Sequence, residues 1–179
     1  MSKNVLILEG SPRVGGNSDI LTDEFIKGAE EAEHDCEKIY LQKLHMEFCL
    51  GCLKCQETKK CVIDDDVDEI LDKMVNADVI VMASPVYYYS MSGQMKTFID
   101  RTNPRCKEAI GKDFYFIISA FTPHKSHLDT IKLDFESYLK CLIDPKIKGI
   151  VEGTDATLVG EIKENQEAMQ KAYELGKNV

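Results

Sequence analysis

Short apolar runs alternate with amphipathic stretches along the whole 179-residue chain. The apolar runs predict five strands, at residues 4–9, 36–41, 78–84, 114–120 and 147–152. The first, third and fourth of these runs are almost continuously apolar, which is typical of strands buried on both faces. We therefore expect these three strands in the middle of a sheet that other elements cover on each side.

The amphipathic stretches predict five helices, over residues 18–33, 67–76, 94–101, 126–143 and 162–176. Strands that alternate with helices need crossover connections, and these favour a parallel sheet with helices on both faces. No repeat, low-complexity tract or linker divides the chain, so we expect a single α/β domain over residues 1–179. In such sheets ligands bind beyond the carboxyl ends of the strands, so the loops after residues 9, 84 and 120 are candidate site loops.

Composition and charge exclude several classes of protein. With 44% hydrophobic and 30% charged residues, the chain is too apolar for an intrinsically disordered protein. Its formal net charge of -9 would repel phosphate backbones and anionic lipids, so we expect no nucleic acid and no membrane partner. The opening apolar run, at residues 5–8, is too short for a secretory signal. We therefore expect a cytoplasmic protein whose seven cysteines are reduced thiols or ligands.

A glycine-rich turn links the first predicted strand to the first predicted helix. Its sequence is GSPRVGGNS, at residues 10–18. Gly15 and Gly16 allow backbone conformations that turn several N–H groups inward, and the next helix adds the positive end of its dipole. Side chains that can donate to an anion come from Ser11, Arg13, Asn17 and Ser18. The turn predicts a phosphate site; the simpler alternative is that Asn17 or Ser18 only caps the helix.

The turn contains neither G-x-G-x-x-G nor G-x-x-x-x-G-K-[ST], which indicates another class of phosphate ligand. GSPR at residues 10–13, followed by GNS at residues 16–18, resembles the FMN phosphate loop of the NAD(P)H-dependent FMN reductases. SPVYYYSMSGQMKTFIDR at residues 84–101 resembles the flavin-ring loop of that family and the helix after it, and a looser likeness reaches residues 176–177. The resemblance implies a flavodoxin-like three-layer sandwich, with a five-stranded parallel sheet in the order 2-1-3-4-5. It also implies FMN as the cofactor, NAD(P)H as a co-substrate, and a homodimer or homotetramer.

The segment after the third predicted strand suits a flat heterocycle. Pro85 stops the strand, and the residues up to Gly93 can present backbone N–H groups and aromatic faces. Three adjacent rings cannot all face one ligand, so we expect at least one of the tyrosines at residues 87–89 to serve packing or an interface. Ser119 and Ala120 end the fourth strand and are candidates for the edge of the ring. The predicted cofactor-binding residues are Ser11, Arg13, Gly16, Asn17, Ser18, Pro85, Val86, Tyr87, Tyr88, Ser90, Met91, Gly93 and Ser119.

Four of the seven cysteines fall in one short stretch after the second predicted strand. Their spacing, Cys49-x2-Cys52-x2-Cys55-x5-Cys61, resembles the motif of the iron-sulfur flavoproteins, a branch of the same flavodoxin-like group. Thiolates at this spacing can hold a [4Fe–4S] cluster, although the fourth cysteine departs from the ferredoxin pattern. Zinc is an alternative, with ligands more crowded than in typical structural sites. In a third alternative, which flavin reductases with a similar loop suggest, all four are free thiols.

Other polar clusters have simpler interpretations. His124 and His127 lie three residues apart at a helix start but lack an evident third metal ligand. The acidic run at residues 64–66 suits capping of the next helix better than binding of Mg²⁺. The lysine, aspartate and arginine of KTFIDR, at residues 96–101, are expected to pair with one another or with an interface.

We expect the flavin to carry the chemistry, so no side chain is assigned a catalytic role. The predicted activity is that of an NAD(P)H-dependent FMN reductase: a nicotinamide reduces bound FMN, and electrons then pass to a quinone, flavin, nitro compound or metal ion. One open face of the ring, shared by donor and acceptor, predicts ping-pong kinetics. One alternative is an iron-sulfur flavoprotein that carries electrons between ferredoxin, a [4Fe–4S] cluster and FMN. A second is a non-catalytic module that senses redox state or binds metal.

Overall fold

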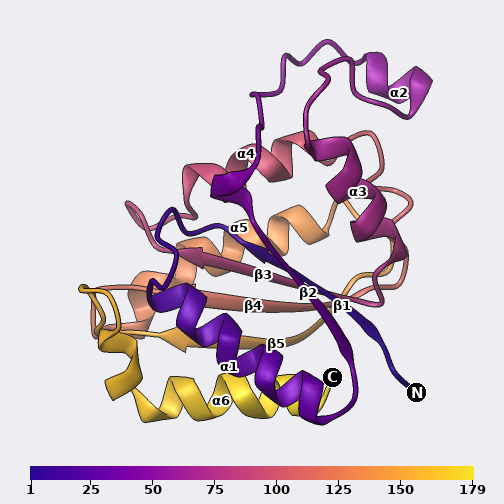
Figure 1. Cartoon of the computed structure of the whole chain (residues 1–179). Coiled ribbons are helices and arrows are strands. Elements are labelled where there is room, and N and C mark those ends of the chain that lie inside the picture. The colour runs from indigo at the N-terminus through magenta and orange to yellow at the C-terminus, as the bar shows by residue number, and fades with distance from the viewer.

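Five parallel strands form one sheet in the order β2-β1-β3-β4-β5 (Figure 1) in the computed structural model, which describes all 179 residues. Every neighbouring pair is parallel, so all five carboxyl ends lie at one edge. The order confirms the expected flavodoxin-like class, and each strand lies within one residue of its predicted ends. The strands are β1 (Asn4–Glu9), β2 (Asp35–Tyr40), β3 (Val79–Pro85), β4 (Asp113–Ser119) and β5 (Lys146–Gly153).

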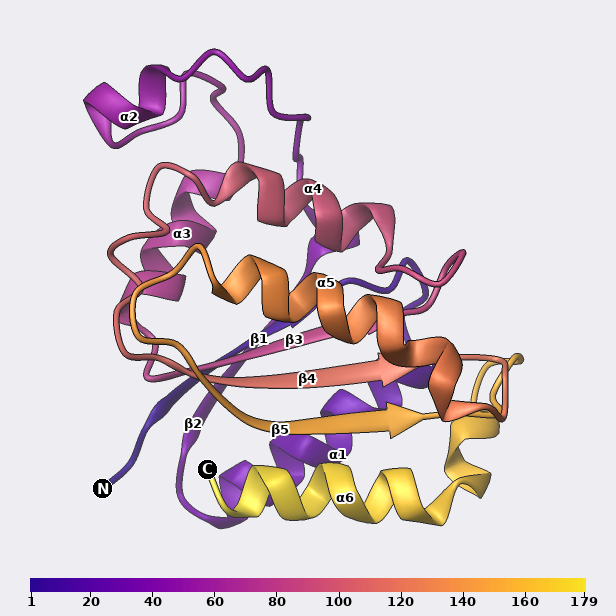
Figure 2. The same ribbon diagram turned by 180° about the vertical axis from the view of Figure 1, so that it is seen from behind.

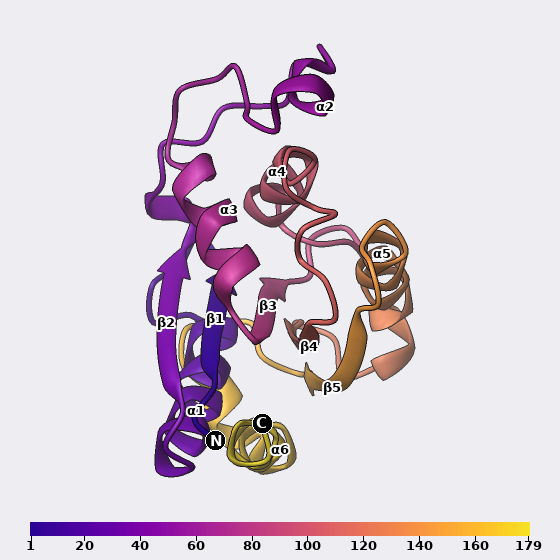
Figure 3. The ribbon, with the colours of Figure 1, turned by 90° about the vertical axis from the view of Figure 1, so that its right-hand side faces the viewer.

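Helices cover both faces of the sheet, as Figure 2 shows from behind and Figure 3 along the layers. One face carries α1 (Asn17–Glu31) and α6 (Gln166–Lys177), and the other carries α3 (Val67–Asn76), α4 (Gly93–Arg101) and α5 (Asp129–Leu139). Three short 3-10 helices lie in the connections: η1 (Leu41–Lys43), η2 (Lys125–Leu128) and η3 (Glu161–Glu164). None of the helices combines the length and the apolar character that crossing a membrane requires.

Alternate residues of the central strands separate two hydrophobic cores. In β1, Val5 and Ile7 pack in the core under α1 and α6, whereas Leu6 and Leu8 pack in the core under α3, α4 and α5. The same alternation runs through β3 and β4. Both faces of the central strands are therefore buried, and this explains why their sequences are almost continuously apolar.

Two of the predicted helices are each divided in the structure. The stretch predicted over residues 126–143 contains η2 and then α5, which ends at Leu139. The stretch predicted over residues 162–176 contains η3 and then α6, where the Asn165 side chain accepts a hydrogen bond from Ala168 N at 3.0 Å and so caps the helix. Apolar spacing does not distinguish a 3-10 turn from the first turn of an α-helix, so these starts were predicted too early.

A protruding segment, residues 44–66, connects η1 to α3 and carries the four clustered cysteines; we call it the cysteine loop. It contains α2 (Lys54–Thr58), a five-residue helix without a buried residue, which is too short to give a periodic pattern in the sequence. Figure 1 shows the loop projecting beyond α3 and α4, away from the sheet.

The two helices on one face approach each other through glycines. A side-chain carbon at Gly28 of α1 would overlap the carbonyl oxygen of Tyr173 in α6. A side-chain carbon at Gly176 of α6 would likewise overlap the carbonyl oxygen of Phe25. No Cβ fits at either crossing point, so the backbones themselves make the contact that seats α6 beside α1.

We predict that Gly28→Ala lowers the free energy of unfolding by about 2 to 3 kcal/mol, because the added methyl group forces α1 and α6 apart. Urea unfolding followed by circular dichroism measures the change. Gly93→Ala is the control, since nothing lies within 4 Å of a Cβ at Gly93 and alanine favours a helix. Equal effects of the two substitutions would contradict the packing role of Gly28.

Candidate functional site

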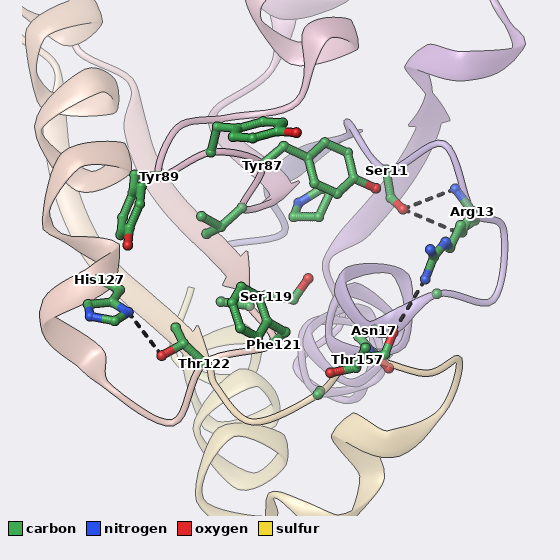
Figure 4. A pocket seen from close by; sticks show the side chains of 16 residues that line it. Ser11, Arg13, Asn17, Tyr87, Tyr89, Ser119, Phe121, Thr122, His127 and Thr157 are labelled. Carbon is green, nitrogen blue, oxygen red and sulfur yellow. Dashed lines mark hydrogen bonds between the residues drawn. The ribbon is translucent and has the colours of Figure 1, made fainter.

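A cavity of about 480 Å³ opens at the carboxyl edge of the sheet (Figure 4). The loops after β1, β3, β4 and β5 supply its walls. Residues of the predicted set that line it are Ser11, Arg13, Gly16, Asn17, Pro85, Val86, Tyr87, Tyr88 and Ser119. Residues outside the predicted set that also line it are Tyr89, Ala120, Phe121, Thr122, His127, Ala156 and Thr157. Predicted residues that do not line it are Ser18, Ser90, Met91 and Gly93.

The turn at residues 10–18, which we call the phosphate loop, is held by its own hydrogen bonds. Ser11 Oγ accepts from Arg13 N at 3.1 Å, and Gly16 N donates to Arg13 O at 3.0 Å. Gly15 adopts a positive φ of 75°, and a Cβ at Gly16 would lie 2.8 Å from Arg13 O. Both glycines are therefore required by the shape of the loop.

The amino end of α1 faces the cavity without a side-chain cap. Its N-cap is Gly16, and no side chain accepts a hydrogen bond from the first turn at this position. Asn17 does not cap the helix, because its Oδ1 accepts hydrogen bonds from Gly160 N at 3.1 Å and Ile162 N at 3.4 Å. Its Nδ2 is left as a free donor on the cavity wall. The simpler alternative, a turn with an Asn17 or Ser18 cap, is therefore wrong, and the first N–H groups of α1 are open to an anion.

Ser18 supports the phosphate loop from its buried side. Its side chain is buried, and its hydroxyl donates to Glu9 Oε1 at 2.9 Å. Glu9 is the last residue of β1, has no exposed surface, and also accepts a hydrogen bond from Ser11 N at 2.8 Å. Burial raises the pKa of Glu9 to about 7. The sequence analysis missed Glu9, because a lone glutamate at a strand end gives no signal of its burial.

Arg13 brings positive charge to the rim of the cavity. Its side chain is exposed, and its Nη1 lies 3.4 Å from Thr157 O in the loop after β5 (Figure 4). The rule that ligands bind at the carboxyl ends of parallel strands applies to β5 as well, so Ala156 and Thr157 could have been selected from the sequence.

The loop after β3 forms the opposite wall through a tight turn. Tyr87 N donates to Ser90 O at 2.9 Å, and Ser90 N donates to Tyr87 O at 3.1 Å. Tyr88 and Tyr89 between them have φ values of 50° and 67°, which glycine or asparagine usually adopts in this type of turn. Strain of about 1 kcal/mol for each such residue is typical of ligand-binding loops.

Two N–H groups of this turn remain free. Val86 N donates to Ser119 O at 2.8 Å and Tyr87 N is bonded to Ser90, whereas the N–H groups of Tyr88 and Tyr89 have no partner within the chain. Tyr88 is fully exposed. The ring of Tyr89 packs edge-on against the ring of His127, with 5.5 Å between the ring centroids. The turn therefore offers two backbone donors and aromatic surface beside the cavity.

The remaining predicted residues lie behind this wall. Ser90 Oγ donates to Asp134 Oδ2 of α5 at 2.6 Å, Met91 packs in the core, and Gly93 begins α4. Ser92, which was not predicted, ties the two loops together. Its hydroxyl donates to Gly10 O at 2.7 Å and accepts from Met95 N at 3.2 Å. These contacts support the wall rather than the cavity surface.

His127 completes the mouth of the cavity from η2. Its Nδ1 lies 3.0 Å from Thr122 Oγ1 (Figure 4). The centroid of its ring lies 5.4 Å from that of the His124 ring. Phe121 beside it is largely exposed. The sequence offers the two histidines only as an incomplete metal pair, and the place of His127 on the cavity wall follows from the position of the loop after β4.

The four clustered cysteines lie on the cysteine loop, outside the cavity. Cys49 and Cys52 are exposed, and Cys55 and Cys61 are half-buried. In this conformation no three metal-ligating side chains come together. Two of the sulfur atoms nevertheless receive N–H donors, from Asn103 Nδ2 to Cys55 Sγ at 3.1 Å and from Arg101 Nη2 to Cys61 Sγ at 3.4 Å. Donors of this kind also surround the sulfur atoms of iron–sulfur centres.

Arg101 fastens both ends of the cysteine loop to α4. Its side chain is 1% exposed and forms two hydrogen bonds with the buried carboxylate of Asp65, at 2.7 and 3.0 Å. It also donates to Glu47 O at 2.6 Å. Only Lys96 and Asp100 form the expected pair on the helix surface, so a surface or interface role for Arg101 is wrong. Its partners lie far away in the sequence, which is why the sequence did not identify them.

We predict that Arg101→Lys lowers the free energy of unfolding by about 3 kcal/mol, because lysine cannot form the paired hydrogen bonds that compensate a buried Asp65. Urea unfolding measures this loss, and limited trypsin digestion should cut faster at Lys54, Lys59 and Lys60. Arg105→Lys is the control, since Arg105 forms partly exposed ion pairs and its replacement should change stability by under about 0.5 kcal/mol. If Arg101→Lys had the stability and the digestion rate of the wild type, Arg101 would not be what attaches the cysteine loop to α4.

The flavodoxin-like fold and the cavity at its carboxyl edge narrow the class of protein. The sequence model of the NADPH-dependent FMN reductase family matches residues 3–134. The chain therefore belongs to that family.

Particular relatives add detail. The chain is 43% identical over 100 residues to an iron-sulfur flavoprotein of Methanocaldococcus jannaschii, covering 56% of this chain and 52% of that one. It is 35% identical over 95 residues to an iron-sulfur flavoprotein of Methanosarcina thermophila, covering 53% and 50%. The chain thus spans about half the length of the curated relatives it matches. An NAD(P)H:quinone oxidoreductase from Methanothermobacter marburgensis shares the fold, with a TM-score of 0.78, 15% identity, and coverage of 99% and 96%.

Proposed function

We propose that the cavity binds FMN and that the chain is an NAD(P)H-dependent flavin oxidoreductase, which passes electrons from a nicotinamide to a small acceptor. One observation carries this proposal: a single cavity of about 480 Å³ joins an uncapped helix end to an aromatic and backbone wall. FMN has the two matching parts, a phosphate monoester and a flat ring. The family description, NADPH-dependent FMN reductase, names the same cofactor.

The phosphate loop supports the anionic end of this proposal. Three kinds of donor can reach phosphate oxygens. The first N–H groups of α1 and the Asn17 Nδ2 group have no side-chain partner, and the Arg13 guanidinium lies at the rim of the cavity. Ser11 Oγ accepts from Arg13 N at 3.1 Å and donates only over a long 3.4 Å contact to Arg13 O, so its hydrogen can turn to a phosphate oxygen instead. Ser18 acts indirectly, through its hydrogen bond to Glu9.

The turn after β3 supports the ring end. Bound FMN accepts a hydride and releases electrons singly or in pairs. The free N–H groups of Tyr88 and Tyr89 are suited to stabilise negative charge on a polar ring edge, while Pro85, Val86 and Ser119 close the inner side. One side of the cavity remains open, so the nicotinamide and a quinone, flavin, nitro compound or metal ion must use it in turn. Ping-pong kinetics follow from this shared opening.

Assembly of two or four copies belongs to the same proposal. Tyr88 is fully exposed next to the cavity, and its backbone conformation is strained. A second copy that covers this ring would bury apolar area and complete the pocket wall.

We predict that Arg13→Ala weakens FMN binding by about 10- to 100-fold, because one charge-assisted hydrogen bond to the phosphate is lost. Binding of riboflavin, which lacks the phosphate, should stay the same. Titration of flavin fluorescence measures both affinities, and Lys27→Ala, on the far half of α1, is the control. Equal loss of FMN and riboflavin binding in Arg13→Ala would contradict the phosphate assignment.

Steady-state kinetics complete this test. With FMN and menadione, wild-type protein should oxidise NADH or NADPH over many turnovers and give parallel double-reciprocal lines. Arg13→Ala should need correspondingly more FMN for the same rate. Intersecting lines would contradict the shared opening, and the absence of turnover in FMN-loaded protein would favour a non-catalytic redox sensor.

A second candidate function rests on the cysteine loop. In an iron-sulfur flavoprotein, a [4Fe–4S] cluster on Cys49, Cys52, Cys55 and Cys61 would relay single electrons between ferredoxin and FMN. The four thiols, the N–H donors to two of their sulfur atoms, and the names of the two archaeal relatives support this candidate. The cysteine loop would have to close for its thiols to surround a cluster.

For this second candidate we predict about four iron atoms and four acid-labile sulfides per chain in protein purified without oxygen. Cys52→Ser should lose most of the iron, because a cluster needs all four thiolates. Cys141→Ser, at an exposed thiol outside the loop, should keep it. Iron-free wild-type protein, or iron unaffected by Cys52→Ser, would refute the cluster and leave the NAD(P)H-dependent function in place.

A further inference from the structure

We infer that Glu9 is a positioning residue that holds a proton while FMN is bound, so that FMN binding is coupled to the uptake of one proton. This inference rests on the proposed function, since it requires the FMN phosphate to lie on the phosphate loop. The side chain does not line the cavity; it acts on the ligand through the loop above it.

Glu9 joins the start of the phosphate loop to the first turn of α1. Its Oε1 atom accepts from Ser11 N at 2.8 Å, at the start of the loop, and from Ser18 Oγ at 2.9 Å, in the first turn of α1. The carboxyl group has no exposed surface, so water cannot replace either bond. The conformation that presents the α1 end to the cavity therefore depends on this one oxygen atom.

The other oxygen, Oε2, lacks a donor. Its neighbour is Thr22 Oγ1 at 3.4 Å, but the single hydroxyl hydrogen of Thr22 has a closer acceptor, Asp19 O, at 2.7 Å. A proton on Oε2 would supply the missing hydrogen, and Thr22 Oγ1 would accept it. The hydrogen bonds around Glu9 are thus complete for a neutral carboxylic acid and incomplete for a carboxylate.

Burial favours the same state most strongly, while the nearby charges are divided: Asp19 favours the neutral acid and Lys38 opposes it. From α1, Asp19 accepts from Gly15 N at 2.6 Å and adds a like charge. From β2, the Lys38 ammonium is shared, because it pairs with both Asp19 and Asp23.

None of the other neighbours forms an ion pair with the Glu9 carboxyl group. On the strands that flank β1, Glu9 stands opposite Tyr40 of β2, whose hydroxyl donates to Asp19 Oδ2 at 3.4 Å, and opposite the apolar Ala83 of β3. Arg13 is exposed on the cavity side of the loop.

The sign of the pH effect follows from these charges. Burial raises the pKa of Glu9 to about 7 without ligand, and a phosphate dianion above the loop would raise it further. At a pH above 7 the free protein must then take up a proton when FMN binds, so FMN affinity should fall as the pH rises. The phosphate of FMN itself ionises near pH 6, so measurements between about pH 7.5 and 9 isolate Glu9.

Titration calorimetry with FMN tests the inference. In wild-type protein the dissociation constant should rise towards about tenfold per pH unit between pH 7.5 and 8.5. Measurements in two buffers of different ionisation enthalpy should show uptake that approaches one proton. In Glu9→Gln, whose amide can keep the same neighbours, the dissociation constant should change less than about twofold over this range. Glu33→Gln, at an exposed glutamate, should behave like wild type.

The outcomes separate this inference from the proposed function. Tight FMN binding with the same pH slope in wild type and Glu9→Gln would overturn the role of Glu9 and leave the FMN site intact. Absence of FMN binding by the wild type at every pH would overturn both. Infrared difference spectra of wild-type protein with and without FMN, with ¹³C-labelled glutamate, give a readout that needs no variant. A labelled band of a protonated carboxyl group in the FMN complex supports the inference, and its absence overturns it.

Discussion

The candidate site depends on the close contact between the phosphate loop and the start of α4. Gly10 N donates to Ala83 O at 2.8 Å, and Gly10 O accepts from Ser92 Oγ at 2.7 Å. A Cβ at Gly10 would lie 2.9 Å from Ala83 O and 3.0 Å from Met95 Cβ, so a larger residue would separate the two loops. Because hydrogen bonds join these segments directly, the phosphate loop and the aromatic wall of the cavity lie close together. A ligand with a phosphate at one end and a ring at the other then meets both at once.

In the proposed FMN complex, local dipoles would outweigh the net charge of this acidic protein and hold the phosphate in this place. The chain carries a formal charge of -9, and two carboxyl groups, Glu9 and Asp19, are buried directly under the loop. Against them stand the uncapped end of α1 and Arg13 at the rim. Lys38 compensates Asp19. A neutral Glu9 would remove the remaining repulsion, whereas an ionised one would face the ligand across a single layer of backbone.

The sequence predicts the strands and the loops of the site well. It predicts the buried polar side chains that hold those loops poorly. Strand ends and the phosphate loop follow from apolar runs and glycine placement, which are local features. Ser92, Arg101 and Glu9 were missed or misread because their partners lie on other elements: Gly10 for Ser92, Asp65 for Arg101 and Thr22 for Glu9. Burial of a polar side chain depends on which distant residues surround it, and one sequence does not contain that information. Motif likeness gave Ser18 and Gly93 the same weight as Asn17, although only Asn17 reaches the cavity surface.

Helix α4 connects the loop after β3 to the cysteine loop, and this connection limits how the two can be arranged. The helix starts at Gly93, directly after the wall of the cavity, and ends at Arg101, which holds Asp65 and contacts Cys61. Nine helical residues span about 13 Å. Cys55 and Cys61 are therefore held near the carboxyl end of α4. Cys49 and Cys52 have no such attachment and are exposed. Closure of the cysteine loop around a ligand would consequently bring the first two cysteines towards the last two, because only Cys55 and Cys61 accept hydrogen bonds from residues at and just after the end of α4.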